Sequence, residues 1–184
     1  MRVFIGVELD EQVQVRAAEI PAALRSREGH GLDARWIPAA DLHITLWFLG
    51  EIAEASLPDL GKPVRTQTFD LAVAGLGAFP GSGVPRAIWL GVQAGWKQLV
   101  ELHADLAPRV QSLGIEPERR AYAPHLTIAR VKAARREDLS RIRDALRETP
   151  ADAGMCRVSA VTVFRSRLSP KGPSYDALIR VPLQ

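Results

Sequence analysis

The sequence predicts an α+β fold with largely antiparallel sheets. Three observations predict it. Short segments rich in β-branched and aromatic residues recur along the chain, segments of helical period separate only some of them, and turn residues follow most of them. Helices are therefore too few for a regular alternation of parallel strands and crossover helices. Because no long linker or low-complexity segment divides the chain, we interpret residues 1–184 as one domain.

The expected elements begin with a strand at Arg2–Leu9, which is rich in β-forming residues. Asp10 is placed as the N-cap of a helix with Val13 and Ala17 on one face, and Pro21 is expected to kink or restart that helix. Further strands are expected at residues 34–37, 42–49, 69–76, 86–92, 124–131, 157–164 and 175–181. Further helices are expected at residues 53–60, 95–113 and 136–147.

The helix expected at 95–113 carries His103 on an apolar stripe with Leu99 and Leu106. This position is typical of a core histidine with satisfied hydrogen bonds. Pro108 should disturb the helix near its end. His30 lies in a loop between two glycines, and its surroundings indicate no role.

The basic residues are mostly arginine and are unevenly distributed. Twenty of the 24 are arginine. Residues 1–91 carry 8 basic and 11 acidic groups, a net charge of −3, and residues 92–184 carry 16 and 10, a net charge of +6. An excess of arginine in one half suits a phosphate-bearing partner, since arginine can hold phosphate through two parallel hydrogen bonds. A genomic bias toward arginine codons would produce the same composition.

The sequence gives no sign of a membrane segment. No apolar run approaches the roughly 20 residues that span a bilayer. The apolar N-terminus turns acidic at Glu8, too soon for a signal peptide. The single cysteine, Cys156, permits neither an internal disulfide nor a cysteine-rich zinc site. We expect a cytoplasmic protein without a membrane partner, and nothing in the sequence implies a protein partner.

Two nearly identical strings lie 82 residues apart, one in each half of the chain. They are Leu42-His43-Ile44-Thr45-Leu46 and Pro124-His125-Leu126-Thr127-Ile128. The chain has four histidines and six threonines, so chance alone would rarely place a threonine two positions after two of the histidines. The repetition therefore indicates a shared role.

In a strand, side chains two positions apart point to the same face. Each string thus presents an imidazole and a hydroxyl to one face, and two packed halves would line one cleft with all four groups. With an unperturbed pKa near 6.5, one imidazole can be neutral while the other is charged. The neutral ring can accept a proton from water and the charged ring can protonate a leaving oxygen, which suits phosphodiester hydrolysis.

Two other interpretations of the strings remain. They are either half-buried strand histidines with ordinary hydrogen bonds, or part of a metal site. A metal site would need a third ligand, and neither string has an acidic residue at the second or fourth position after its histidine. We therefore expect no metal.

The strings and their flanks resemble the 2H phosphoesterase superfamily, and most closely its bacterial and archaeal RNA 2′,3′-cyclic phosphodiesterases, formerly called 2′-5′ RNA ligases. The resemblance covers nearly the whole chain. The other matching segments are residues 2–7, 35–37, 41–50, 75–80, 85–91, 122–130 and 164–175.

The resemblance implies a bilobal α+β fold, in which two antiparallel sheets face a central cleft and the helices lie outside. It also implies metal-independent hydrolysis of RNA 2′,3′-cyclic phosphate ends to 2′-phosphates, with no cofactor. By match to the motifs, His43 resembles the proton donor to the departing 3′ oxygen and His125 the acceptor that activates water. Thr45, Thr127 and Arg130 resemble phosphate-binding residues. Some relatives also join tRNA halves through a 2′-5′ bond, so tRNA halves are a further expected partner.

Arg130 fits this match only under a condition. Strict alternation from His125 sends Arg130 to the opposite face, so the strand must twist, bulge or end near Ala129 for Arg130 to reach a phosphate. Otherwise Arg130 is a surface arginine.

Trp47 shares the predicted side of His43 and Thr45, at a position where many relatives have lysine. As a substrate-binding residue it would stack on a nucleobase, and the alternative is an apolar wall of the cleft. Phe48, on the other side of the strand, is expected in the core.

Competing functions are a cyclic phosphodiesterase for a small nucleotide and a non-catalytic RNA-binding module. The loop Gly81-Ser82-Gly83 has no following lysine, which disfavours a nucleotide triphosphate site and an ATP-driven ligase. Four arginines would line an approach for RNA or form a solvated face, namely Arg119, Arg120, Arg165 and Arg167.

Overall fold

The structure is a computed structural model that describes residues 1–29, 31–116, 120–169 and 172–184. The strands in this part of the chain are β1 (Arg2–Glu8), β2 (Leu32–Trp36), β3 (His43–Glu51), β4 (Phe69–Phe79), β5 (Ala87–Ala94), β6 (His125–Ala134), β7 (Asp152–Val158), β8 (Ala160–Ser169) and β9 (Gly172–Pro182). The α-helices are α1 (Glu11–Glu28), α2 (Leu57–Leu60), α3 (Trp96–Ser112) and α4 (Leu139–Glu148).

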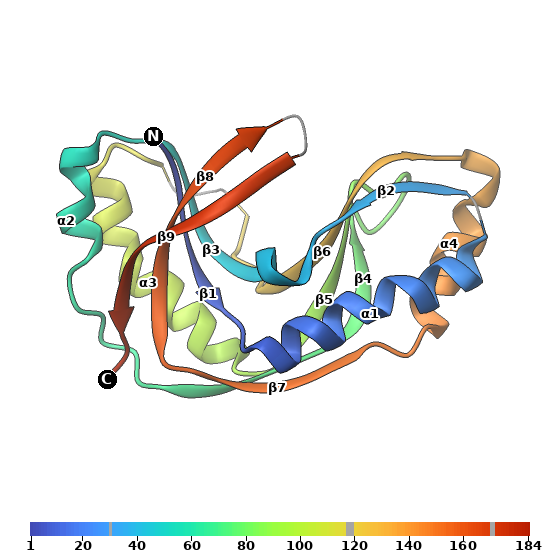
Figure 1. The fold of residues 1–184 in the computed structure, drawn as a ribbon, viewed down its shortest axis with the longest axis horizontal. Helices are drawn as coiled ribbons and strands as arrows, with labels where there is room; N and C mark the ends of the chain where they lie inside the picture. Colours follow the sequence, from blue (N-terminus) through green and yellow to red (C-terminus); the bar gives the residue numbers. More distant parts are fainter. Residues whose placement is uncertain (30, 117–119, 170–171) are drawn as a thin grey trace.

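The described strands form one sheet in the order β7-β4-β5-β6-β3-β1-β8-β9, and β2 pairs with β6. All their pairings are antiparallel. The sheet curls, with α2 and α3 outside one end and α1 and α4 outside the other (Figure 1). The predicted combination of antiparallel strands and external helices is therefore confirmed.

The expected arrangement of two separate sheets is not confirmed. One residue pair, Ile44 with Leu126, joins β3 to β6 and makes the sheet continuous. The strand group β3-β1-β8-β9 lies on one side of this junction, and the group β7-β4-β5-β6 with β2 lies on the other. The two strands that carry the His-x-Thr strings are thus the ones that meet at the middle of the sheet.

The first helix begins where the sequence predicts. The side chain of Asp10 accepts a hydrogen bond from the backbone N–H of Val13 at 2.9 Å, and Val13 and Ala17 are buried. The helix continues through Pro21, and α3 continues through Pro108, so neither proline ends a helix. Since α1 packs on β7 and α4, tertiary contacts compensate for the hydrogen bond that Pro21 cannot donate.

The strand predicted at residues 157–164 is wrong as a single element. β7 ends at Val158 and β8 begins at Ala160. β7 pairs with β4, while β8 pairs with β1 and β9, so the chain crosses at Ser159 from one side of the sheet to the other. The run of β-forming residues continues across this crossing, which hides it in the sequence.

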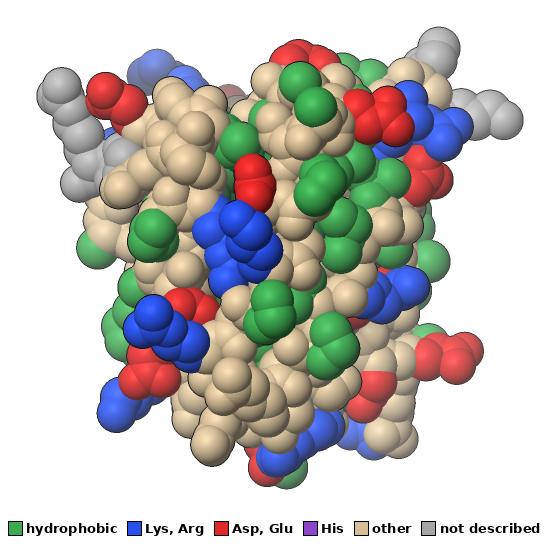
Figure 2. All heavy atoms as spheres, turned by 90° about the vertical axis from the view of Figure 1, so that its left-hand side faces the viewer, with side chains coloured by type: hydrophobic (Ala, Val, Ile, Leu, Met, Phe, Trp, Pro, Cys, Tyr) green, Lys and Arg blue, Asp and Glu red, His purple; other side chains and the backbone are tan. Residues whose placement is uncertain are grey.

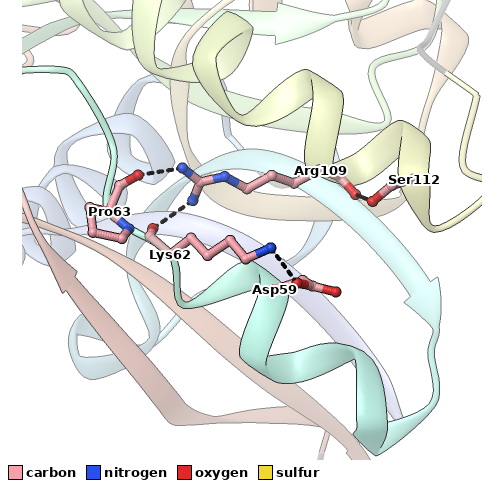
Figure 3. A network of polar contacts seen from close by, with 5 residues as sticks. All are labelled: Asp59, Lys62, Pro63, Arg109 and Ser112. Atoms are coloured by element: carbon pink, nitrogen blue, oxygen red, sulfur yellow. Dashed lines mark hydrogen bonds and ion pairs between the residues drawn. The ribbon is translucent and has the colours of Figure 1, made fainter.

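At the end of the molecule that carries α2 and α3, polar contacts join α3 to the segment after α2 (Figure 3). The Arg109 guanidinium donates hydrogen bonds to the carbonyl oxygens of Lys62, at 2.6 Å, and Pro63. Lys62 Nζ lies 2.6 Å from Asp59 Oδ1. Arg109 therefore serves the packing of this end of the molecule.

Figure 2 shows the end of the molecule at the left of Figure 1. Basic and acidic side chains are interspersed over it, and no histidine is visible among the atoms coloured there. No helix in the described part of the chain is long and apolar enough to cross a membrane.

Candidate active site

The two His-x-Thr strings lie next to each other in the sheet. Ile44 and Leu126 pair across β3 and β6, and both are fully buried. In antiparallel strands the residues flanking such a pair face each other crosswise, so His43 lies beside Thr127 and Thr45 lies beside His125. The two imidazoles and two hydroxyls therefore share the face opposite the buried pair.

A cavity of about 450 Å³ opens on this face, and we call it the inner cavity. His43, Thr45, Thr127 and Arg130 line it. Its other polar lining residues are Arg2, Arg35, Asp41, Ser166 and Tyr175. Its remaining lining residues are Val3, Phe4, Ile37, Pro38, Phe48, Gly50, Leu168 and Pro173. A space of this size is in the range that binds small organic ligands.

Both histidines are held by the same backbone contact. Nδ1 of His43 lies 2.7 Å from the Asp41 carbonyl oxygen, and Nδ1 of His125 lies 2.7 Å from the Ala123 carbonyl oxygen. Because a carbonyl oxygen can only accept, each Nδ1 carries the proton and donates it. When either ring is neutral, its Nε2 lone pair is thus free to accept a proton.

His43 is enclosed by aromatic rings. Its ring stacks on Phe4 at 4.6 Å between centroids and meets the edge of Tyr175 at 5.0 Å. Burial lowers the pKa of His43, the Arg130 charge lowers it further, and the hydrogen bond to the Asp41 carbonyl acts in the opposite direction.

His125 borders a second hollow of about 800 Å³, which we call the outer hollow. The outer hollow is lined by Phe79, Pro80, Val84, Arg86, Ala87, Arg120, His125 and Arg130. The His125 ring contacts Phe79 edge to face, with 5.0 Å between centroids. Burial also lowers the pKa of His125, with a smaller contribution from Arg130. Arg130 lines both spaces and thus connects the two histidines.

Arg130 reaches the inner cavity because β6 contains a bulge. Ala129 pairs with Ile88 and Thr127 pairs with Trp89, so Ile128 is an extra residue in the ladder. An extra residue reverses the alternation beyond it, and it turns Ala129 into the core and Arg130 toward the cavity. The condition that the sequence set for Arg130 is therefore met by a bulge one residue before Ala129.

β3 has the same bulge at the equivalent position. Trp47 pairs with Ile5 and Thr45 pairs with Gly6, which leaves Leu46 as the extra residue. The structure therefore does not bring Trp47 to the cavity, because its side chain is only 5% exposed. The core position predicted for Phe48 is wrong, since Phe48 is 60% exposed and lines the inner cavity.

Trp47 instead belongs to a stack of three rings behind β3. His103 lies between Trp47, at 4.1 Å, and Tyr122, at 4.3 Å, and the three rings are nearly parallel. Trp47 Nε1 donates to the His103 carbonyl oxygen at 2.9 Å, and the Tyr122 hydroxyl donates to the Thr45 carbonyl oxygen at 2.9 Å. Burial lowers the pKa of His103. The stack therefore fixes the backbone at the bulge. His103 packs between the two rings as predicted for a structural residue, but it is half-buried and does not lie fully in the core.

Sequence reasoning assigned no role to several residues of the inner cavity, above all Arg2, Arg35 and Asp41. Burial raises the pKa of Asp41, and the Arg35 charge opposes that rise. The Arg35 guanidinium lies against Gly172, where an added Cβ would be 1.4 Å from Nη2. Since Gly172 has φ of +119°, glycine is required there both for space and for conformation. This contact brings β2 and β9 together beside the cavity.

The remaining candidates are placed as follows. Arg120 lines the outer hollow, and Arg167 pairs with Asp176, with its Nε 2.6 Å from Oδ2. Arg165 is half-buried on β8 and lines neither space. His30 and Arg119 lie outside the described residues. Within the described ranges, no three side chains of His, Cys, Asp or Glu form a group that could hold a metal ion.

The site thus combines His43 and the hydroxyl donors in the inner cavity with His125 in the outer hollow, and the Arg130 guanidinium lines both spaces. Nε2 of each histidine can take or give a proton. Arg130 and the two threonine hydroxyls are donors suited to the oxygens of an anion such as phosphate. The arrangement is therefore equipped for acid–base chemistry on a bound phosphate ester.

Comparison with known proteins gives consistent matches. The family model of the 2′-5′ RNA ligase superfamily matches residues 10–169. The RNA 2′,3′-cyclic phosphodiesterase of Methanothermobacter thermautotrophicus is 33% identical over 181 residues, which cover 95% of each chain. That of Aeropyrum pernix is 33% identical over 165 residues, which cover 87% of this chain and 93% of the relative. A crystal structure of a protein from Thermus thermophilus matches with a TM-score of 0.75 and 31% identity, covering 100% of this chain and 98% of the other.

Proposed function

Because the chain belongs to the 2′-5′ RNA ligase superfamily, we propose that it hydrolyses RNA 2′,3′-cyclic phosphate ends to 2′-phosphomonoesters. The activity in the names of its relatives, RNA 2′,3′-cyclic phosphodiesterase, supports this proposal. The single observation that carries it is the crosswise placement of His43, Thr45, His125 and Thr127 around the Ile44–Leu126 pair. An RNA substrate also fits the cytoplasmic location that the sequence predicts.

In the proposed reaction, water attacks phosphorus in line with the 3′ oxygen. Nε2 of His125 accepts a proton from the water, and Nε2 of protonated His43 gives a proton to the departing 3′ oxygen. The new bond joins the water oxygen to phosphorus, and the bond between phosphorus and the 3′ oxygen breaks. The fixed Nδ1–H contacts support these roles, because they leave both Nε2 atoms available.

Thr45, Thr127 and Arg130 are the proposed phosphate-binding residues. Negative charge builds up on the non-bridging oxygens as water attacks, and donors already in place stabilise it without reorganisation. Arg130 suits this role because it lines the spaces next to both histidines.

A bound phosphate anion would also favour the protonated form of His43, which the reaction needs as its acid. Burial lowers the pKa of His43, which disfavours the proton that a general acid must carry. An anion beside the ring favours its charged form and raises its pKa. Substrate binding is therefore the step that protonates His43 in this proposal.

The proposed mechanism requires no metal and no cofactor, because the two imidazoles perform both proton transfers. The same two proton transfers also permit RNA ligation, which is the reverse of cleaving a 2′-5′ bond to a cyclic phosphate. The 5′-hydroxyl of a second RNA then replaces water, the oxygen–phosphorus bond forms, the 3′ oxygen leaves, and a 2′-5′ linkage results. The two ends of a cleaved tRNA are substrates of this chemical type.

The decisive test uses a short RNA ending in a 2′,3′-cyclic phosphate, with a chelator present. We expect a 2′-phosphate product, and undiminished activity with the chelator. A 3′-phosphate product would contradict the assignment of the leaving oxygen, and binding without turnover would indicate an RNA-binding module. A nucleoside 2′,3′-cyclic phosphate in parallel reveals whether a small cyclic nucleotide is the better substrate.

A further inference from the structure

The outer hollow beside His125 is open and can hold more than a water molecule. A water molecule occupies roughly 30 Å³ in the liquid, whereas the outer hollow has a volume of about 800 Å³. His125 and Arg130 form its border with the inner cavity. The outer hollow therefore has room for a nucleophile larger than water.

The direction of the proposed reaction indicates what the outer hollow faces. In an in-line displacement the attacking and leaving oxygens lie on opposite sides of phosphorus. If His43 protonates the 3′ oxygen, the nucleoside that carries the cyclic phosphate lies on the His43 side. The nucleophile then approaches from the His125 side, which is the side of the outer hollow.

The lining of the outer hollow has the chemistry of a nucleic-acid site. Phe79 and Val84 are 39% and 37% exposed and lie together in the hollow, so an aromatic ring is accessible beside His125. Arg86 and Arg120 are exposed, and no carboxylate in the described part of the chain forms an ion pair with either. An exposed aromatic ring beside unpaired guanidinium groups suits a base and its phosphates.

Arg86 is fixed at the entrance by its backbone. Its N–H donates to the Phe79 carbonyl oxygen at 2.7 Å, and its carbonyl oxygen accepts from the Val131 N–H at 3.0 Å. Phe79 in turn contacts the His125 ring. Arg86 is therefore held near the base that would activate the nucleophile.

We propose that the outer hollow binds the 5′-hydroxyl end of a second RNA strand. The inference rests on the proposed function, and it assigns the second substrate of RNA ligation its own binding site. The 5′ oxygen attacks phosphorus and gives its proton to Nε2 of His125. The bond from phosphorus to the 3′ oxygen breaks, and that oxygen takes the proton of His43. Phe79 supports the first base of the second strand, and Arg86 binds its first internucleotide phosphate.

The test measures joined and hydrolysed products in one reaction, with an RNA ending in a cyclic phosphate and a second oligonucleotide with a free 5′-hydroxyl. Arg86→Glu should lower the ratio of joined to hydrolysed product at least about tenfold, which corresponds to the loss of one charge-assisted hydrogen bond. Val84→Glu, at an exposed position in the same hollow, should lower the ratio as well.

Arg136→Glu is the matched control, because Arg136 is exposed, lies outside both spaces and undergoes the same charge change. Equal losses in Arg86→Glu and Arg136→Glu, or no loss in Arg86→Glu, would overturn the inference. So would a wild-type protein that hydrolyses the cyclic end but joins nothing at saturating acceptor, an outcome that leaves the proposed hydrolysis intact.

A further arm tests whether the outer hollow holds the upstream nucleotides of the first RNA instead. In that case Arg86→Glu would raise KM for hydrolysis of the RNA end and not of a nucleoside 2′,3′-cyclic phosphate, without any acceptor present. This result would also overturn the inference. A wild type without any hydrolysis would show that the proposed function itself fails.

Discussion

β3 and β6 contain the same local structure in different surroundings. Each begins with a histidine whose Nδ1 donates to the carbonyl two residues earlier, and each has a bulge at the third residue after that histidine. Beyond the bulge, the fourth residue is buried and the fifth faces the site. The fourth residues are Trp47 and Ala129, and the fifth are Phe48 and Arg130.

The surroundings of the two histidines differ, although the two strands have the same local structure. His43 is enclosed by Phe4, Phe164 and Tyr175, whereas His125 borders the wider outer hollow. The shared backbone gives both imidazoles the same chemical capability. In the proposed reaction this difference in enclosure would place the nucleoside on the side of His43 and the nucleophile on the side of His125.

The largest expected effect comes from removing either histidine. His43→Ala and His125→Ala should each lower kcat by roughly 10²–10⁴, the usual contribution of one proton transfer. A phosphodiester with a 4-nitrophenolate leaving group separates the roles, because nitrophenolate departs without a proton. His43→Ala should recover most activity on that substrate, and His125→Ala should not. Recovery in both variants, or in neither, would contradict the assignment of acid and base.

Arg130, the fifth residue after His125 on β6, should act on the chemical step. Arg130→Gln removes a charged donor from the phosphate, and loss of one such donor typically lowers kcat by about 10²–10³. Steady-state kinetics on an RNA with a cyclic end measures it. Lys132→Gln is the control, since Lys132 is exposed on the same strand and lines neither space. An equal loss of kcat in the control would mean that Arg130 acts only through its positive charge and not as a donor to the phosphate.

Phe48, the fifth residue after His43 on β3, should act on substrate binding instead. Phe48 is exposed in the inner cavity, where it can stack on a base, a contact worth about 1–3 kcal/mol. Phe48→Ala should therefore raise KM about tenfold while kcat changes little. Phe48→Tyr, which keeps the ring, should restore the wild-type KM. If Phe48→Ala lowered kcat alone, the proposal that Phe48 acts on binding and Arg130 acts on the chemical step would be contradicted.

The bulges also explain what the sequence could and could not predict. Alternation with period two placed His43 with Thr45, and His125 with Thr127, because both pairs precede the bulges. It placed Trp47 and Phe48 on the wrong faces, because one extra residue reverses every side chain after it. A bulge depends on pairing with a distant strand, and the string itself carries no sign of it. Gly6, opposite Thr45, is the one local hint, since glycine within a strand often marks a bulge or a close approach.

The larger arrangement was predictable only in part, for a similar reason. Nearly all strands were expected close to their observed positions, because β-forming residues and turns are local signals. Whether the strands form one sheet or two depends on the single pair Ile44–Leu126, and nothing local encodes it. Arg35 and Asp41 were missed because their roles depend on contacts across the cavity, as the position of Arg35 against Gly172 illustrates.

The two histidines should respond together to a change in charge between them. Burial lowers both pKa values below 6.5, and the Arg130 charge lowers both further. The reaction needs one protonated and one neutral ring, so kcat/KM should be bell-shaped with its optimum below pH 6.5. Arg130→Gln removes the positive charge, raises both pKa values and moves the optimum to higher pH. A pH profile of kcat/KM checks the direction, and a shift to lower pH, or a movement of only one limb, would contradict the effect of the Arg130 charge on both rings.

The smallest expected effect concerns how each bulge is held. On β6 the carbonyl of the extra residue, Ile128, accepts from the backbone N–H of Ile37 at 2.9 Å. On β3 the Thr45 carbonyl accepts from a side chain, the Tyr122 hydroxyl. Tyr122→Phe keeps the ring stacked on His103 but removes the side-chain donor to that carbonyl, which should cost about 0.5–1.5 kcal/mol of stability.

Because the Tyr122 hydroxyl bonds to β3 and not to the catalytic atoms, loss of this hydroxyl should loosen Thr45 and His43 more than His125. Tyr122→Phe should therefore lower kcat on the cyclic RNA end a few-fold, and less on the nitrophenyl ester, whose turnover does not need His43. Denaturant unfolding measures the stability, and the ratio of kcat on the two substrates measures the positioning. Equal losses of kcat on both substrates would mean that the stack supports the whole sheet. In that case it would not matter for catalysis that a side chain holds the bulge on β3 and the backbone holds the bulge on β6.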